Sequence, residues 1–133
     1  NRLGGEGDGF KIAMRALDGG RVNIAACSLG SAQRCFELAR DYTQERKQFG
    51  KPLAAFQATQ FRLAQMAATL YGNRLMIRDA AQLLDAKHPQ AAVHCAMAKL
   101  VVTEQCYQVV DHAMQLYGGY SYIKDYPIER HSR

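Results

Sequence analysis

Apolar residues recur at helical spacing along most of the chain, in segments separated by glycine and proline. The first segment begins at Gly9 or the residue before it and continues to about Tyr42, which predicts one long helix. The Gly19-Gly20 pair is a weak point in it, because glycine lowers helix stability. The apolar positions of this segment are Phe10, Met14, Leu17, Ile24, Leu29, Ala32, Phe36 and Ala39. Phe49–Pro52 ends the helix, since proline lacks an amide donor and glycine permits the turn.

Two further long helices follow. The second is predicted from about Phe56 to Leu84, and the His88-Pro89 pair breaks the chain after it. Its seam of apolar residues is Leu63, Met66, Leu70, Ile77, Ala80 and Leu84. The third helix ends at Gly118-Gly119. Its stripe is Cys95, Ala98, Val102, Cys106, Val109, Ala113 and Leu116.

The segments together predict an all-α fold. No segment shows strand alternation, and long helices with short connections pack as an up-and-down bundle, here one domain over residues 1–133. Pro127 suits the first turn of a fourth helix, of which Ile128 to Arg133 is only the beginning. A bundle groove lacking its fourth helix predicts self-association, by symmetric packing or by helix exchange about hinges at Lys51-Pro52 or His88-Pro89.

Composition and charge narrow the classes of partner. A chain of 133 residues that is 48% hydrophobic can build one core without metal or disulfides. No apolar run is long enough to cross a bilayer, and the glycine-rich start is unlike a signal peptide, so no membrane partner is expected. The net charge is +5, but basic and acidic residues alternate in Asp41–Lys47. The sign of the charge alone does not choose between nucleic acid, a membrane surface and a small polyanion such as a nucleotide cofactor, but this scattering disfavours nucleic acid.

Cysteine and histidine offer no candidate metal or redox site. The four cysteines are Cys27, Cys35, Cys95 and Cys106. They lie in apolar helical stretches without CxxC or zinc-ligand spacing, so we expect buried, inert thiols in a reducing compartment. His112 and His131 form no triad or ligand pattern and are interpreted as ordinary polar positions.

Four short motifs occur in order along the chain. They are Asn1-Arg2-Leu3-Gly4 with Glu6 and Gly9-Phe10; Asp18-Gly19-Gly20-Arg21; Glu45–Gly50 with Pro52-Leu53 and Phe56-Gln57; and Gln115–Gly119 with Tyr120 and Tyr126-Pro127. Jointly the motifs resemble the C-terminal helical domain of acyl-CoA dehydrogenases, a four-helix bundle. The Asp-Gly-Gly-Arg motif with Ser28-Leu29-Gly30, and the stretch Tyr122–Tyr126, are similar to the isobutyryl-CoA dehydrogenases, which act on a branched chain.

The resemblance implies contacts with FAD across a subunit interface. It assigns them to Arg46, Phe56, Gln57, Gln115, Leu116, Tyr117, Gly118 and Gly119. From the residues alone, Arg46 is either a forked donor to a pyrophosphate or a solvated cation at a helix C-terminus. Phe56-Gln57 either reaches flavin or adenosine atoms or is an ordinary capping turn. Gly118-Gly119 is a helix C-cap from the residues alone, and the resemblance implies that its backbone approaches the ADP part of FAD closely.

The resemblance also implies that Asp18, Gly19, Gly20 and Arg21 border the acyl-CoA channel, where the glycines leave space. From spacing alone, Asp18 and Arg21 form an ion pair one helical turn apart. In the family a glutamate removes the α-proton while hydride leaves for the flavin. That residue is expected beyond Arg133, and the alternative position corresponds to Gly20, which has no carboxylate. No catalytic residue is therefore assigned, and the 133-residue chain is expected to be inactive and colourless.

The parent enzyme implied by the resemblance oxidises a short or branched acyl-CoA to the 2-enoyl-CoA and passes electrons to an electron-transfer flavoprotein. It would be a homo-oligomer, a tetramer, located in the cytoplasm if bacterial and in the mitochondrial matrix if eukaryotic. Two alternatives remain at this point. One is a stand-alone helical interaction module without a cofactor, and the other is an acyl-CoA oxidase fragment, which shares the fold but gives electrons to oxygen.

Overall fold

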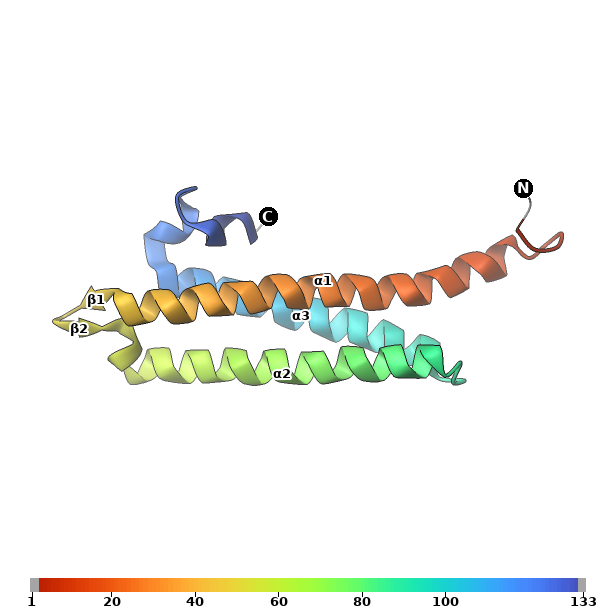
Figure 1. Cartoon of the computed structure of the whole chain (residues 1–133), viewed down its shortest axis with the longest axis horizontal. Helices are drawn as coiled ribbons and strands as arrows, with labels where there is room; N and C mark the ends of the chain where they lie inside the picture. The colour runs from red at the N-terminus through yellow and green to blue at the C-terminus, as the bar shows by residue number, and fades with distance from the viewer. Residues whose placement is uncertain (1–2, 132–133) are drawn as a thin grey trace.

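The computed structural model describes residues 3–131 as three long α-helices lying along one another (Figure 1). Helix α1 spans Gly9–Glu45, α2 spans Gln57–Asp85 and α3 spans Ala91–Tyr117. The short elements are strands β1 (Lys47–Gln48) and β2 (Lys51–Pro52) and 3₁₀ helices η1 (Leu53–Ala55), η2 (Gly118–Tyr122) and η3 (Pro127–His131). The all-α, up-and-down prediction is confirmed.

Two predicted features fall on residues that lie outside the described range. Asn1 and Arg2 begin the opening motif, and Arg133 is the last residue of the expected fourth helix. Within the described range, Pro127 starts the 3₁₀ helix η3 and not an α-helix, and Ile128 is fully buried behind it.

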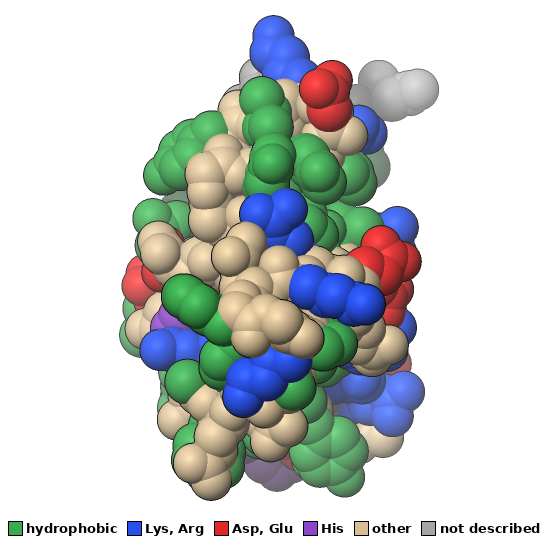
Figure 2. Space-filling model, turned by 90° about the vertical axis from the view of Figure 1, so that its left-hand side faces the viewer, with side chains coloured by type: hydrophobic (Ala, Val, Ile, Leu, Met, Phe, Trp, Pro, Cys, Tyr) green, Lys and Arg blue, Asp and Glu red, His purple; other side chains and the backbone are tan. Residues whose placement is uncertain are grey.

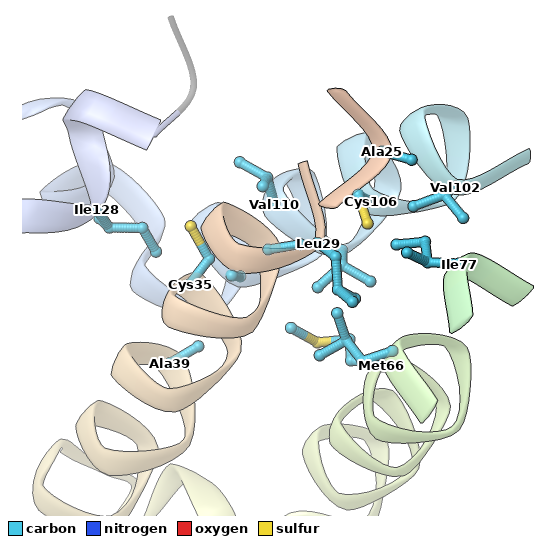
Figure 3. Packing of buried hydrophobic residues seen from close by; sticks show 14 of the residues in the cluster. Ala25, Leu29, Cys35, Ala39, Met66, Ile77, Val102, Cys106, Val110 and Ile128 are labelled. Atoms are coloured by element: carbon cyan, nitrogen blue, oxygen red, sulfur yellow. The ribbon is translucent and has the colours of Figure 1, made fainter. Parts of the chain in front are cut away.

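The core forms where the stripes of the three helices meet. In α2 and α3 the predicted positions hold, because Met66, Leu70 and Ile77 are buried against Val102 and Cys106. Figure 3 shows Leu29 of α1 beside Met66 and Ile77 of α2, so all three helices contribute to one cluster. The seam read from the sequence of α2 and α3 is therefore the one that packs.

The predicted first helix is confirmed as α1, but its apolar positions differ in burial. Leu29, Ala32 and Ala39 are buried, and four others are exposed. These are Phe10, Met14, Leu17 and Ile24. The first turns of α1 project beyond the ends of α2 and α3, so no described element covers them (Figure 1). Leu17 and Ile24 line an open hollow that α3 reaches with Lys99. The helix runs unbroken through Gly19 and Gly20.

A short hairpin, which the sequence pattern does not predict, joins α1 to α2. Lys47 pairs with Pro52 and Gln48 with Lys51, leaving a two-residue turn at Phe49 and Gly50. Both turn residues have positive φ, 52° and 80°, which is the geometry that matches the twist of paired strands.

Three of the four thiols are buried as expected, and Cys27 is exposed, so the prediction is wrong there. Burial raises the pKa of the Cys35 thiol to about 11, against the lowering effect of Arg34, and burial also raises the pKa of Cys95 and Cys106. No helix in residues 3–131 combines the length and apolar character needed to cross a membrane.

Candidate cofactor and substrate sites

The hairpin end of the bundle gathers the predicted cofactor residues from three helices. Arg46 follows α1, Phe56-Gln57 begins α2, and Gln115–Gly119 ends α3. They meet because α2 runs opposite to α1 and α3, so the end of α1, the start of α2 and the end of α3 lie together (Figure 1). Figure 2 looks onto this end and shows Lys and Arg side chains spread over the middle of the face. The site is thus a positively charged end of the bundle.

Arg46 is fixed at both its backbone and its side chain. Its N–H donates to the Tyr42 carbonyl at 2.8 Å, and its carbonyl accepts from the Leu53 N–H at 2.8 Å. The guanidinium carbon lies 5.4 Å from the centre of the Tyr120 ring. This cation–π contact orients the planar guanidinium while leaving its edge free to donate hydrogen bonds.

Packed tyrosines form the floor beside Arg46. Tyr42 stacks on Tyr117 with ring centres 4.1 Å apart, and Tyr126 meets both rings edge-on. The Tyr117 hydroxyl donates to the Leu38 carbonyl at 3.2 Å. Burial raises the pKa of Tyr42 and Tyr117, and for Tyr42 the charge of Arg46 opposes that rise. Tyr117 is only 6% exposed, so its side chain supports the site from within the bundle.

The hairpin presents a residue that sequence reasoning missed. Phe49 is 93% exposed and has positive φ, a strained conformation for a bulky residue. Its ring meets Phe56 edge-on at 6.4 Å, and the Lys51 ammonium lies 4.2 Å from the centre of the Phe56 ring. The signal in the sequence was a large aromatic in a two-residue turn, a position that favours asparagine or glycine. Phe49 and Lys51 therefore join Phe56 at the rim of the site.

The remaining predicted residues leave polar groups facing solvent. Gln57 and Gln115 are exposed, and no side chain caps the start of α2 at Phe56. Gly118 has a φ of 59°, and at neither Gly118 nor Gly119 would a Cβ meet an atom of the described chain within 4 Å. The backbone here is open to close approach by a ligand. Leu116 is half-buried against the core.

The second predicted site lies far along α1. At about 1.5 Å of rise per residue, Arg21 and Arg46 are roughly 38 Å apart. Arg21 Nη1 lies 2.5 Å from Asp18 Oδ1, so the predicted ion pair is confirmed. Gly20 and Arg21 line an apolar hollow of about 600 Å³, and a Cβ at Gly19 or Gly20 would meet nothing within 4 Å. The other lining residues are Ala13, Ala16, Leu17, Ile24 and Lys99.

Lys99 enters this second site from α3, which sequence reasoning missed because the two segments are distant along the chain.

The two histidines that the sequence analysis interpreted as ordinary polar positions, His112 and His131, form specific contacts. His112 Nε2 lies 2.6 Å from Arg62 Nη1, and His131 Nδ1 lies 3.0 Å from Ser31 Oγ. Burial, followed by nearby arginines, lowers the pKa of both imidazoles. Within residues 3–131 no three His, Cys, Asp or Glu side chains are placed to hold a metal ion.

Comparison with known proteins places these motifs in one family. The sequence model described as "Acyl-CoA dehydrogenase, C-terminal domain" matches residues 7–133. The mitochondrial isobutyryl-CoA dehydrogenase of Dictyostelium discoideum is 57% identical over all of this chain and 32% of its own length. Butyryl-CoA dehydrogenase from Megasphaera elsdenii has a solved structure with a TM-score of 0.93 at 42% identity, covering 98% of this chain and 34% of that one.

A third match is a chain in the structure described as "Electron transferring flavoprotein of Acidaminococcus fermentans". Its TM-score is 0.93 at 43% identity, over 98% of this chain and 34% of that one. The chain spans about a third of the length of the relatives it matches. Because the family model covers nearly all of its residues, the chain belongs to the acyl-CoA dehydrogenase family, in the region of the C-terminal helical domain.

Proposed function

We propose that this domain is part of an FAD-dependent acyl-CoA dehydrogenase that oxidises a short or branched acyl-CoA to the 2-enoyl-CoA. The observation that carries the proposal is the convergence of Arg46, Gln57 and Gln115–Gly119 at one charged end of the bundle. Similarity to isobutyryl-CoA dehydrogenase supports the branched substrate. FAD, when bound, supplies the acceptor for the hydride that leaves the β-carbon.

The side chains at the hairpin end fit the polar half of FAD. Arg46, whose guanidinium lies over the Tyr120 ring, offers a fork of N–H donors of the kind that binds a pyrophosphate. The uncapped start of α2 adds free amides and the exposed Gln57. Beside Gly118 and Gly119 the space is open, so a nucleotide can lie against the backbone. These residues bind and orient the cofactor and do no chemistry themselves.

The distance between the two sites supports an arrangement across subunits. Arg46 and Arg21 are separated by roughly 38 Å of helix, so the two candidate sites of one chain are well apart. We propose that a flavin held at the hairpin end of one subunit serves an acyl-CoA channel in another copy. The enzyme would then be a homo-oligomer, which we propose is a tetramer.

The hollow beside Gly20 suits the acyl-CoA. Its floor is apolar, the absent side chain at Gly20 keeps it open, and Arg21 and Lys99 flank it with positive charge. We assign the proton-abstracting carboxylate to another part of the enzyme, since Asp18 is engaged with Arg21. We propose an electron-transfer flavoprotein as the electron acceptor, and a location in the mitochondrial matrix in a eukaryote or the cytoplasm in a bacterium.

The test compares two adjacent cations in the full-length enzyme. Arg46→Ala should weaken FAD binding about 10-fold or more, because a charged hydrogen bond contributes about 1.5–3 kcal/mol. Lys47→Ala should bind FAD nearly as well as wild type, because Lys47 lies exposed on β1. The measurement is the FAD dissociation constant from flavin fluorescence, together with isobutyryl-CoA and butyryl-CoA oxidation. Equal loss in both variants contradicts the site, and turnover with oxygen as acceptor indicates an oxidase.

A further inference from the structure

The α2–α3 turn, residues 86–90, lies beside the N-terminal half of α1 and forms a further hollow with it (Figure 1). The volume of this hollow is about 500 Å³. It is lined by Arg15 and Asp18 of α1, by Lys87 and His88 of the turn, and by the first turn of α3. We call it the basic pocket, and it is separate from the apolar hollow beside Gly20.

The basic pocket carries a net positive charge. Arg15 and Lys87 are exposed, and within residues 3–131 neither forms a salt bridge. The one carboxylate among the lining residues, Asp18, is paired with Arg21, so its charge is compensated. The start of α3 adds the partial positive charge of a helix N-terminus. Two unpaired cations beside one hollow favour an anionic ligand.

Lys87 has a backbone conformation that a lysine rarely adopts. Its φ is 53°, in the left-handed region. The Lys87 N–H donates to the Leu84 carbonyl at 3.1 Å, and the His88 N–H donates to the Leu83 carbonyl at 2.9 Å. These two bonds close the end of α2 around a left-handed residue, a position at which glycine is usual because it has no Cβ. A lysine that accepts such strain is typical of a ligand site.

The same turn fixes the hydrogen-bonding role of His88. Its Nδ1 accepts from the Gln90 N–H at 3.2 Å, so in the neutral imidazole the proton lies on Nε2. The Nε2–H group is then available as a donor at a residue that lines the pocket. A guanidinium, an ammonium and an imidazole N–H together suit an anion with several acceptor oxygens, such as a phosphate.

The Asp18–Arg21 ion pair stands between the basic pocket and the apolar hollow. Asp18 lines the basic pocket, Arg21 lines the hollow beside Gly20, and the two side chains are in contact. A ligand that extends past this pair therefore meets an apolar wall on one side and cations on the other. An acyl-CoA has two matching parts, because its acyl-pantetheine arm is uncharged and its nucleotide carries phosphate groups.

We infer that the basic pocket binds phosphate groups of the CoA nucleotide through Arg15, Lys87 and His88. The acyl-pantetheine arm then lies in the hollow beside Gly20. The inference rests on the proposed function, since it takes an acyl-CoA as the substrate. It gives the α2–α3 turn a part in substrate affinity, and the three side chains position the substrate without touching the reacting atoms.

The first test compares two thioesters in the full-length enzyme. Arg15→Ala combined with Lys87→Gly should raise the KM for isobutyryl-CoA and the dissociation constant of CoA about 10-fold or more, because two charge-assisted contacts are lost. The kcat should stay within about 2-fold of wild type, since the bond-breaking step is unaffected. With isobutyryl-pantetheine, which lacks the phosphates, the KM should equal that of wild type. Steady-state kinetics and titration calorimetry measure these constants.

The control is Arg78→Ala, which removes an exposed cation of α2 that lines neither the basic pocket nor the hollow beside Gly20. It should leave both thioesters unchanged. An equal rise in KM for the two thioesters in the double variant overturns the inference, and so does an unchanged KM for isobutyryl-CoA. The second result is also expected if the pocket binds free phosphate and not the CoA nucleotide.

The second test separates substrate binding from folding at a single residue. Lys87→Gly relieves the strained φ, so the unfolding temperature should stay the same or rise. The dissociation constant of CoA should nevertheless rise about 3-fold or more, as expected for loss of an exposed charge pair. Lys87→Arg keeps the charge and should restore most of the affinity. An unchanged dissociation constant for Lys87→Gly overturns the inference.

The two proposals can fail separately. An enzyme that oxidises isobutyryl-CoA, but whose KM is the same in the double variant, overturns the basic pocket alone. An enzyme whose affinity for CoA falls in the double variant, but which oxidises no acyl-CoA, overturns the proposed function alone.

Discussion

The two ends of α1 are equally helical and lie in opposite environments. Near the hairpin, Tyr42 stacks on Tyr117 and meets Tyr126 edge-on, and three helices converge. Near the start, Phe10 and Leu17 are exposed at 77% and 47%. The difference lies in the neighbours and not in the apolar content of the helix. The hairpin end of α1 lies in a buried core, and the N-terminal end presents apolar side chains that no other element of the described chain covers.

The contrast bears on function. At the hairpin end, side chains locked by packing hold Arg46 and the Gly118 turn in place, which is what a cofactor site requires. At the projecting end, the hollow beside Gly20 is open on one side and takes its final shape from whatever covers it. The hairpin end can therefore offer a ligand rigid contacts, whereas the shape of the hollow beside Gly20 depends on what covers it.

The largest expected effect is on the free energy of unfolding, and it contrasts Tyr117 at the hairpin end with Leu17 in the N-terminal half of α1. In the 133-residue chain, Tyr117→Ala should lower the free energy of unfolding by about 3–5 kcal/mol, since it removes a buried ring and its hydrogen bond to Leu38. Leu17→Ala should lower it by less than about 1 kcal/mol, because Leu17 is 47% exposed and leaves no enclosed cavity. Urea unfolding followed by circular dichroism measures both. Similar losses in the two variants would mean that Leu17 is covered.

Sequence periodicity predicted the parts of the fold that depend on local pattern. The seam at Met66, Leu70 and Ile77 was correct because each residue packs against a helix of matching stripe. The same method grouped Phe10 with the apolar positions of the first helix, and Phe10 is exposed. Periodicity identifies an apolar face but carries no information about whether another element lies against it.

The candidate site was predicted from motifs, and the residues and contacts that the motifs did not include were left out for a physical reason. The motifs gave Arg46 and Gly118, but the contact of Arg46 with Tyr120 joins residues far apart in sequence. Lys99 reaches the hollow of Gly20 only because α1 and α3 pack together. Phe49 was overlooked because its exposure follows from a two-residue turn in a hairpin that strand patterns are too short to reveal.

A second prediction contrasts one glycine from each end and expects opposite signs. Gly118→Ala should destabilise the chain by about 1–3 kcal/mol, because its positive φ is strained for any residue with a Cβ. Gly19→Ala should stabilise it by about 0.5–1 kcal/mol, since alanine favours the helix and nothing lies within 4 Å. Thermal unfolding of both variants checks this. A destabilising Gly19→Ala would show that another element packs on that face.

The smallest expected effect concerns the ion pair at the projecting end. Arg21 and Asp18 are 2.5 Å apart, with side chains 38% and 18% exposed, so water screens much of their attraction. Asp18→Asn in the 133-residue chain should therefore cost less than about 1 kcal/mol at low salt. The cost should vanish near 1 M salt, where the screening length falls to about 3 Å.

Asp41→Asn is the matched control, because the pair of Asp41 with Arg40 lies nearer the hairpin and both side chains are about half exposed. It should cost still less. Urea unfolding at two salt concentrations measures both, and a salt-independent loss above about 2 kcal/mol for Asp18→Asn would indicate a desolvated pair. That result would mean that the residues of the α2–α3 turn beside Asp18 exclude water from the pair.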